Sequence, residues 1–208
     1  MPQHLFRKAF LAAGLTLAVS SVGLAQEKQA PPPTLSGADA VMLANTCAGC
    51  HGTEGASHGP ASPTIAGISK AYFVEVMKGF ADDSIYSTIM GRIAKGYSED
   101  EIKLMAEYFA SKPFVKAKQS FDKGEADKGA KLHKNYCEKC HANNGSSAED
   151  DSGILAGQWT PYLHYSMEDF QTGKREMPKK MKQQFEKMQE KEGEAGLKSL
   201  MNFYASQQ

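Results

Sequence analysis

Two stretches of this chain carry the same five-residue pattern, and their relation limits the possible folds more than any other feature. Residues 47–51 and 137–141 both read Cys-x-x-Cys-His and lie 90 positions apart. Other residues agree at the same offset, without a gap, over about 40 positions, which is typical of a duplicated unit. The pairs include Ala40 with Ala130, Asn45 with Asn135, Gly67 with Gly157, Tyr72 with Tyr162, Met77 with Met167 and Phe80 with Phe170. The sequence therefore predicts two copies of one domain.

Each copy is predicted to be helical. Apolar residues recur at the spacing of a helical face, and no stretch shows the alternation typical of a strand. Ser98, with Glu101 three residues later, has the capping-box pattern that starts a helix, and Pro113 ends it. The expected helices span 38–45, 70–78 and 99–111 in the first copy and 126–136, 161–170 and 195–206 in the second. The expected fold class is all-α, with two tandem domains.

The N-terminal segment, residues 1–25, is predicted to be a secretory signal peptide. Arg7 and Lys8 precede a run of apolar and small residues, 9–24, and small residues precede the expected cleavage site. The run is too short and too rich in Gly and Ser for a membrane span. Export would place the protein in the periplasm, and no later stretch predicts a membrane span.

The rest of the chain divides into a leader, two domains and a linker. Residues 26–36 include three consecutive prolines and are expected to form a flexible leader. The predicted domains span 37–112 and 124–208, joined by a Lys-rich linker over 113–123. Because Lys and Arg together number 24, and Asp and Glu also number 24, the chain lacks the basic balance typical of nucleic-acid binding.

The two cysteine pairs allow four kinds of site. A disulfide framework leaves the His after each pair unexplained, a thioredoxin-like redox pair belongs beside a strand–helix–strand unit, and a four-cysteine zinc site needs both pairs close together. Covalent haem c explains all three residues, because two thiols on one turn reach the two vinyl groups and the His reaches the iron. The predicted cofactors are two haems c, attached at Cys47, Cys50, Cys137 and Cys140, with His51 and His141 as proximal ligands.

A sixth iron ligand is expected in each copy, and in electron-carrying cytochromes c it is a methionine. Met90, in the loop before the last helix of the first copy, is the expected ligand there. The second copy offers Met181, which needs one inserted residue to match Met90, and Met177, which needs three deleted ones. Met181 is the prediction, and Met177 remains the alternative.

Other polar and aromatic residues near the motifs receive supporting roles. Pro63, twelve residues after the first proximal His, is expected to accept a hydrogen bond from its ring, which would orient the imidazole. The second copy has Gly153 at this position, so its backbone is expected to take that role. The remaining expectations are surface or interdomain positions for His58, His133 and His164, and packing against haem or a domain interface for Trp159 and Tyr162.

With these residues in place, the chain resembles the class I dihaem cytochromes c, including the cytochrome c4 family. It is also similar to the cytochrome subunit of flavocytochrome c sulfide dehydrogenase, and the segments 87–98 and 174–181 favour this second family.

The second resemblance implies a dihaem electron-transfer subunit that is not catalytic by itself. An FAD-containing flavoprotein subunit would oxidise sulfide and pass electrons singly to one haem, and a small soluble cytochrome c would accept them from the other. The alternative implied by the first resemblance is a free-standing cytochrome c4-like carrier that donates to a terminal oxidase.

Overall fold

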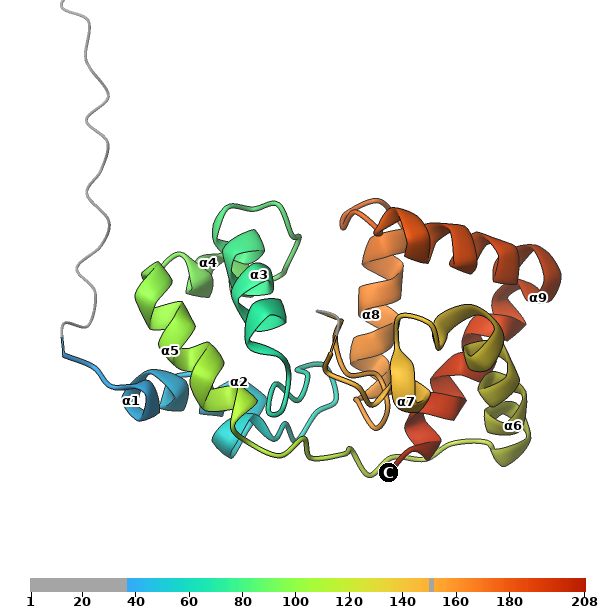
Figure 1. Ribbon diagram of the computed structural model, residues 1–208, viewed down its shortest axis with the longest axis horizontal. Helices are drawn as coiled ribbons and strands as arrows, with labels where there is room; N and C mark the ends of the chain where they lie inside the picture. Colours follow the sequence, from blue (N-terminus) through green and yellow to red (C-terminus); the bar gives the residue numbers. More distant parts are fainter. Residues whose placement is uncertain (1–36, 150–151) are drawn as a thin grey trace, which may run out of the picture. The chain divides into compact units, whose positions relative to one another are not determined.

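The computed structural model describes residues 37–149 and 152–208, which belong to one compact unit (Figure 1). The predicted signal peptide and leader, residues 1–36, lie outside the described residues. Every regular element within the described ranges is helical, and none is a strand, which confirms the all-α prediction. Among these residues, no helix is long and apolar enough to cross a membrane.

The first half of the structure is built on three helices that share one core. Its elements are α1 (Ala40–Asn45), α2 (Ala48–His51), η1 (Thr53–Gly55), α3 (Lys70–Ala81), α4 (Met90–Ala94) and α5 (Glu99–Ala110). Leu43 of α1, Phe73 of α3 and Phe109 of α5 are buried in the same apolar cluster. The Phe73 and Phe109 rings lie 5.6 Å apart between centroids. This shared burial holds the three helices together, and α1 leads directly into the short α2, which carries most of the first motif.

Helix α5 begins where the sequence predicts. The Ser98 side chain accepts a hydrogen bond from the Glu101 backbone, and the Glu101 side chain accepts one from the Ser98 backbone. This reciprocal arrangement satisfies two donors that a helix start leaves without partners in the helix. The predicted capping box is therefore confirmed.

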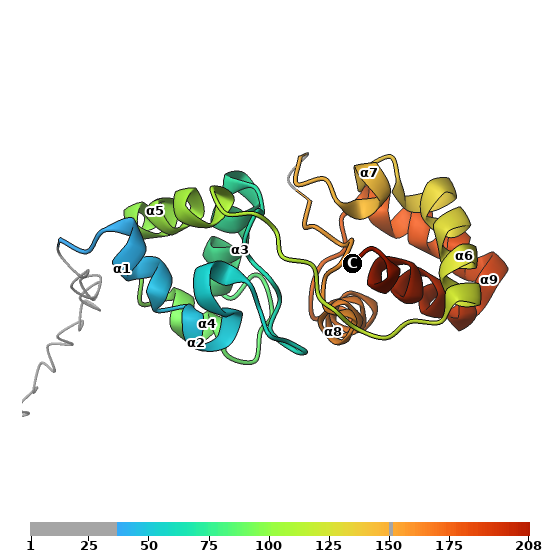
Figure 2. The same ribbon diagram turned by 90° about the horizontal axis from the view of Figure 1, so that it is seen from below.

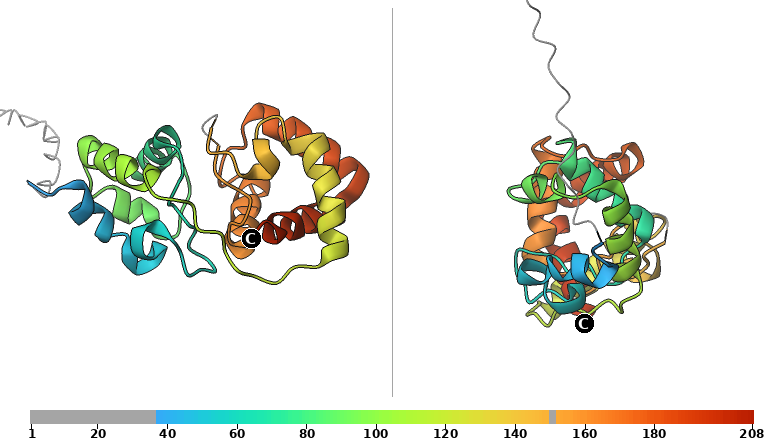
Figure 3. Two further views of the ribbon diagram at one scale, coloured as in Figure 1. Left: turned by 60° about the horizontal axis from the view of Figure 1, so that its bottom comes forward. Right: turned by 90° about the vertical axis from the view of Figure 1, so that its left-hand side faces the viewer.

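The second half repeats the plan with longer terminal elements. It contains α6 (Lys123–Leu132), the π-helical turn η2 (His133–Cys137), α7 (Ala142–Gly145), α8 (Thr160–Gln171) and α9 (Lys179–Ser206). Helix α6 lies beside the C-terminal part of α9 (Figure 3), and Leu132 and Leu200 are buried in the second apolar cluster. Helix α9 is broken at Gly193, whose φ of 57° lies in the left-handed region, so its charged first part and its buried second part run in different directions.

The chain passes from α5 to α6 without helical structure over residues 113–122, and Figure 2 shows this segment joining the two halves. The segment is held by backbone and side-chain hydrogen bonds. The Ala117 amide donates to the Gly157 carbonyl at 2.7 Å, and Gln119 Nε2 donates to the Gln158 carbonyl at 2.8 Å. The connection therefore lies fixed along the second half near residues 157–158.

Candidate haem sites

The first Cys-x-x-Cys-His motif forms one tight turn. Cys47 is the N-cap of α2, and its carbonyl accepts from the Cys50 amide at 3.2 Å and from the His51 amide at 2.9 Å. Side chains three and four residues apart on a helix lie on the same face. The turn therefore presents two thiols and an imidazole together.

The ring of His51 is held by the backbone of Pro63. Its Nδ1 lies 2.9 Å from the Pro63 carbonyl oxygen. A carbonyl can only accept, so Nδ1 carries the proton and Nε2 keeps the lone pair that binds a metal. Burial lowers the pKa of His51, which favours the neutral imidazole, and the Pro63 hydrogen bond opposes this in part. Neutral imidazole is the form that ligates iron.

The second motif has the same turn but a different ring environment. The Cys137 carbonyl accepts from the Cys140 amide at 3.1 Å and from the His141 amide at 2.9 Å. The buried His141 Nδ1, however, has no hydrogen-bond partner among the described residues. The expectation that the Gly153 backbone would take the role of Pro63 is wrong for this structure, since no bond joins it to His141 Nδ1. Burial lowers the pKa of His141 as well.

A buried polar network next to the second motif was not expected. His133 is fully buried, and its Nδ1 lies 3.0 Å from the Tyr204 hydroxyl, while its Nε2 lies 2.5 Å from Glu138 Oε2. The prediction of a surface or interdomain position for His133 is therefore wrong, because both of its partners belong to the second half. His58 and His164 are exposed as expected. The repeat carried the signal, because His133 aligns with Leu43, which is buried in the first core.

The methionines differ in how they relate to the two cores. Met90 is the first residue of α4 and packs, partly buried, against the first apolar cluster. Met181 lies in the first turn of α9, and Met177 lies just before this helix; both are partly buried. Ile89 and Ile93, which flank Met90, are 50% and 38% exposed. These apolar side chains suit an apolar group beside Met90.

The state of the thiols argues against the other kinds of cysteine site. All four cysteines are free. Burial raises the pKa of the Cys47 thiol and raises that of Cys137 to about 11, whereas reactive redox cysteines have lowered values. Among residues 37–149 and 152–208, no three His, Cys, Asp or Glu side chains gather in a group that could hold a metal ion. In each motif, two thiols and an imidazole on one turn form a donor set that fits haem c.

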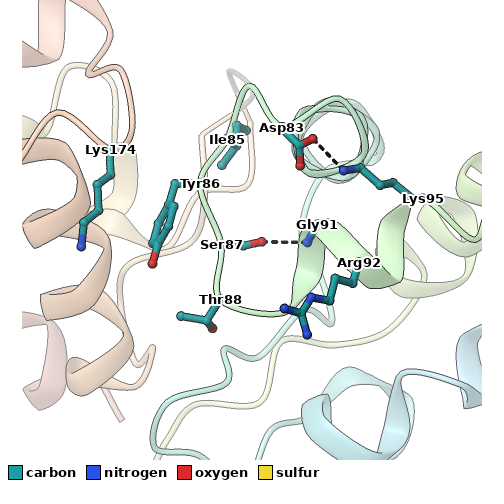
Figure 4. A pocket seen from close by; sticks show the side chains of 9 residues that line it. All are labelled: Asp83, Ile85, Tyr86, Ser87, Thr88, Gly91, Arg92, Lys95 and Lys174. Atoms are coloured by element: carbon teal, nitrogen blue, oxygen red, sulfur yellow. Dashed lines mark hydrogen bonds and ion pairs between the residues drawn. The ribbon is translucent and has the colours of Figure 1, made fainter.

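A cavity of about 470 Å³ adjoins the start of α4 and is drawn in Figure 4. Its lining is mainly polar: Asp83, Ile85, Tyr86, Ser87, Thr88, Gly91, Arg92, Lys95 and Lys174. Ser87 Oγ accepts from the Gly91 amide at 2.7 Å, and Lys95 Nζ pairs with Asp83 Oδ2 at 2.6 Å. These bonds hold the loop before α4, and with it the position of Met90.

Comparison with known proteins identifies the family. Residues 35–112 match the cytochrome c family. The chain is 40% identical over 104 residues to the cytochrome subunit of sulfide dehydrogenase of Chlorobaculum tepidum, covering 49% of this chain and 94% of that protein. It is 30% identical over 148 residues to cytochrome c4 of Azotobacter vinelandii, covering 64% of this chain and 70% of that protein.

The fold agrees over a longer stretch than the sequence does. The structure of reduced cytochrome c4 from Pseudomonas stutzeri matches with a TM-score of 0.68 and 21% identity, and the match covers 81% of this chain and 98% of that one. The two motif-bearing halves thus have the architecture of a cytochrome with two haem domains. The chain belongs to the cytochrome c family, as an electron-transfer protein with two covalently bound haems c that is related to the cytochrome subunit of sulfide dehydrogenase and to cytochrome c4.

Proposed function

We propose that this chain is the electron-transfer subunit of a sulfide dehydrogenase. It would accept electrons from an FAD-containing flavoprotein subunit and pass them to a small soluble cytochrome c. The observation that carries the proposal is the 40% identity to a cytochrome subunit of sulfide dehydrogenase, which extends over 94% of that protein. The match covers half of this chain, so it supports the electron-transfer role of one haem domain. The second domain would add a second haem to the route that the electrons follow.

The proposed ligands follow from the two motif turns. Cys47 and Cys50 would hold the first haem, with His51 and Met90 on its iron. The second would be held by Cys137 and Cys140, with His141 and Met181 on its iron and Met177 as the alternative. When bound, each haem supplies an iron that takes up and releases one electron.

The protein's own residues would hold these ligands in place and supply two ligands to each iron. The Pro63 carbonyl fixes the His51 ring and its tautomer. Met90 is held by the packing of α4 against α3 and by the Ser87 bond to its neighbour Gly91. Because neither iron would keep an open position, the chain would not be catalytic by itself, and substrate chemistry would belong to its partner.

The proposed location is the periplasm. The predicted signal peptide supports export, and the acceptor would be a soluble cytochrome c in the same compartment. The proposed domains are 37–112 and 124–208, with the linker 113–123. Each contains one motif turn and most of one apolar cluster, and the first cluster also includes Ile154 of the second domain. Each domain would therefore enclose its own haem.

A free-standing cytochrome c4-like carrier is the second candidate. It is favoured by the fold match, which covers 81% of this chain and thus both halves. Such a carrier would diffuse between a donor and a terminal oxidase without a stable flavoprotein partner.

Purification from the native source separates the two candidates. The proposed subunit should elute with a flavoprotein, and flavin and haem should be present in a ratio of about one to two. Elution as a lone, flavin-free dihaem protein would reject the first candidate and leave the carrier. Washing the complex at high salt before elution is the control, because it removes partners held only by surface charge.

A further inference from the structure

One peptide group lies between the first proximal histidine and a side chain of the second half. His51 Nδ1 donates to the Pro63 carbonyl at 2.9 Å. The Thr64 amide, which belongs to the same peptide group, donates to Gln158 Oε1 at 2.9 Å. The two bonds form a continuous chain from the imidazole of the first motif, through one backbone amide, to Gln158.

The Gln158 amide is fixed in the orientation that this chain requires. Its Oε1 also accepts from the Trp159 amide at 3.1 Å, and its Nε2 donates to the Thr64 carbonyl at 2.9 Å. A flipped amide would place Nε2 against two donors and Oε1 against an acceptor. Thr64 and Gln158 are 2% and 3% exposed, so water does not compete for these groups.

Hydrogen bonds at the two ends of a peptide group strengthen each other. An acceptor at the N–H end draws charge toward the carbonyl oxygen, which becomes a better acceptor in turn. A stronger acceptor on Nδ1–H makes the imidazole a more basic ligand. A more basic ligand stabilises ferric over ferrous iron. The two hydrogen bonds therefore lower the reduction potential of an iron held by His51.

Among the described residues, the second site does not form this series of hydrogen bonds. Gly153 stands at the position of Pro63, Ile154 at that of Thr64, and Ile68 at that of Gln158. Ile154 is buried in the apolar cluster of the first half. His141 Nδ1 has no partner within the described ranges. The arrangement therefore distinguishes one iron from the other.

We propose that Gln158, supplied by the second haem domain, is a positioning residue for the first haem and sets its potential through the Pro63–Thr64 peptide group. The inference rests on the proposed ligation of iron by His51. It makes the potential of the first haem depend on the contact between the two domains, because the residue that polarises its ligand belongs to the other domain.

The test is a spectroelectrochemical titration of the holoprotein carrying Gln158→Met. This change keeps the side-chain volume and removes the partners of the Thr64 backbone amide and carbonyl. The potential of the first haem should rise, and that of the second should not change. Gln119→Met is the matched control, because Gln119 bonds Gln158 and Thr160 but not the Thr64 amide. Gln119→Met should leave the potentials of both haems unchanged.

The sign of the shift separates this role from general loosening of the interface. Water entering a loosened site favours the charged ferric form and lowers the potential. An unchanged or lowered potential in Gln158→Met would therefore overturn the proposal, as would equal shifts at both haems. If Gln158→Met yields no dihaem protein, Gln158→Glu decides, because it keeps an acceptor for Thr64: a potential at or below that of the unmodified protein is expected, and a rise overturns the proposal.

These measurements use neither sulfide nor a partner protein, so their failure leaves the proposed electron-transfer function standing. The absorption spectrum of the same sample reports the ligands. A spectrum of the first haem that His51→Ala leaves unchanged would show that the ligation by His51, and with it this inference, is wrong.

Discussion

At the scale of single residues, the histidines that end the two motifs are equivalent in sequence but not in surroundings. The His51 ring donates to a carbonyl, whereas His141 Nδ1 has no partner among the described residues. Hydrogen bonding at this nitrogen tunes the basicity of a metal-bound imidazole. Identical motifs therefore do not predict identical potentials for the two haems.

Replacing Met90 tests the sixth ligand of the first haem. Met90→Ala removes the only thioether at the start of α4, so the first iron should become high-spin and its potential should fall, because a thioether ligand favours ferrous iron. The change should halve the intensity of the sulfur-to-ferric-iron absorption band. Met105→Leu, in the buried core of α5, is the control and should leave the band intact. Full retention of the band in Met90→Ala would contradict the assignment.

The choice between Met181 and Met177 is tested by the same band. Met181→Ala should remove the contribution of the second haem, and Met177→Ala should not. The reason is the repeat, in which Met181 lies one position, and Met177 three positions, from the register of Met90. The opposite result would assign Met177, which lies just before α9, as the sixth ligand of the second haem.

At the scale of secondary-structure elements, the apolar pattern predicted the long helices because their faces are buried. The predicted helices 70–78 and 161–170 correspond to α3 (Lys70–Ala81) and α8 (Thr160–Gln171). The pattern missed α2, α4 and α7, which are too short to show a period. The charged residues before Gly193 are helical as well; their charge pattern, typical of a solvated helical face, indicates this helix, because an exposed helix has little apolar periodicity to detect.

The junction between η2 and α9 is predicted to depend on His133. His133→Leu, which introduces the residue found at the same place in the first copy, leaves Tyr204 and Glu138 without a shared partner. A buried polar group left unpaired costs roughly 1–3 kcal/mol of unfolding free energy. Denaturant unfolding of the holoprotein measures this loss, with the exposed His164→Ala as the control. Equal stability of the two variants would show that the network does not stabilise the second domain.

At the scale of the whole molecule, residues far apart in sequence join the two halves. Trp159 Nε1 donates to the Ser57 carbonyl at 3.2 Å, and its ring covers Gly59. This confirms the expectation that Trp159 packs at a domain interface. The sequence could suggest such packing, but not the partners, because no pattern relates residues 57–64 to residues 158–159.

A single methyl group should weaken this interface. A Cβ added at Gly59 would lie 2.3 Å from the Trp159 ring, whereas one added at Gly173 would meet nothing within 4 Å. Both glycines have positive φ, so alanine costs about 1–2 kcal/mol of backbone strain at either place. Gly59→Ala should lose more stability than Gly173→Ala and should increase proteolysis of the 113–122 segment. Equal protease resistance of both variants would contradict the importance of the contact.

The sequence predicted the motif turns because covalent haem attachment demands a fixed local spacing, whereas the methionine ligands stay a prediction. It could not predict the His133 network or the bonds of Gln158, because both depend on contacts between segments that are distant along the chain. His133 joins Glu138 to Tyr204, and Gln158 joins the second half to Thr64. These contacts surround the sites and distinguish one from the other.

The most direct measurement is an anaerobic titration of the native-source protein with sulfide, together with any partner that purifies with it, while haem absorption is followed. The proposed function predicts that sulfide reduces both haems and that an oxidised soluble cytochrome c then reoxidises them. Haems that stay oxidised in excess sulfide, in a sample that dithionite reduces fully, would contradict the proposed role as the electron-transfer subunit of a sulfide dehydrogenase.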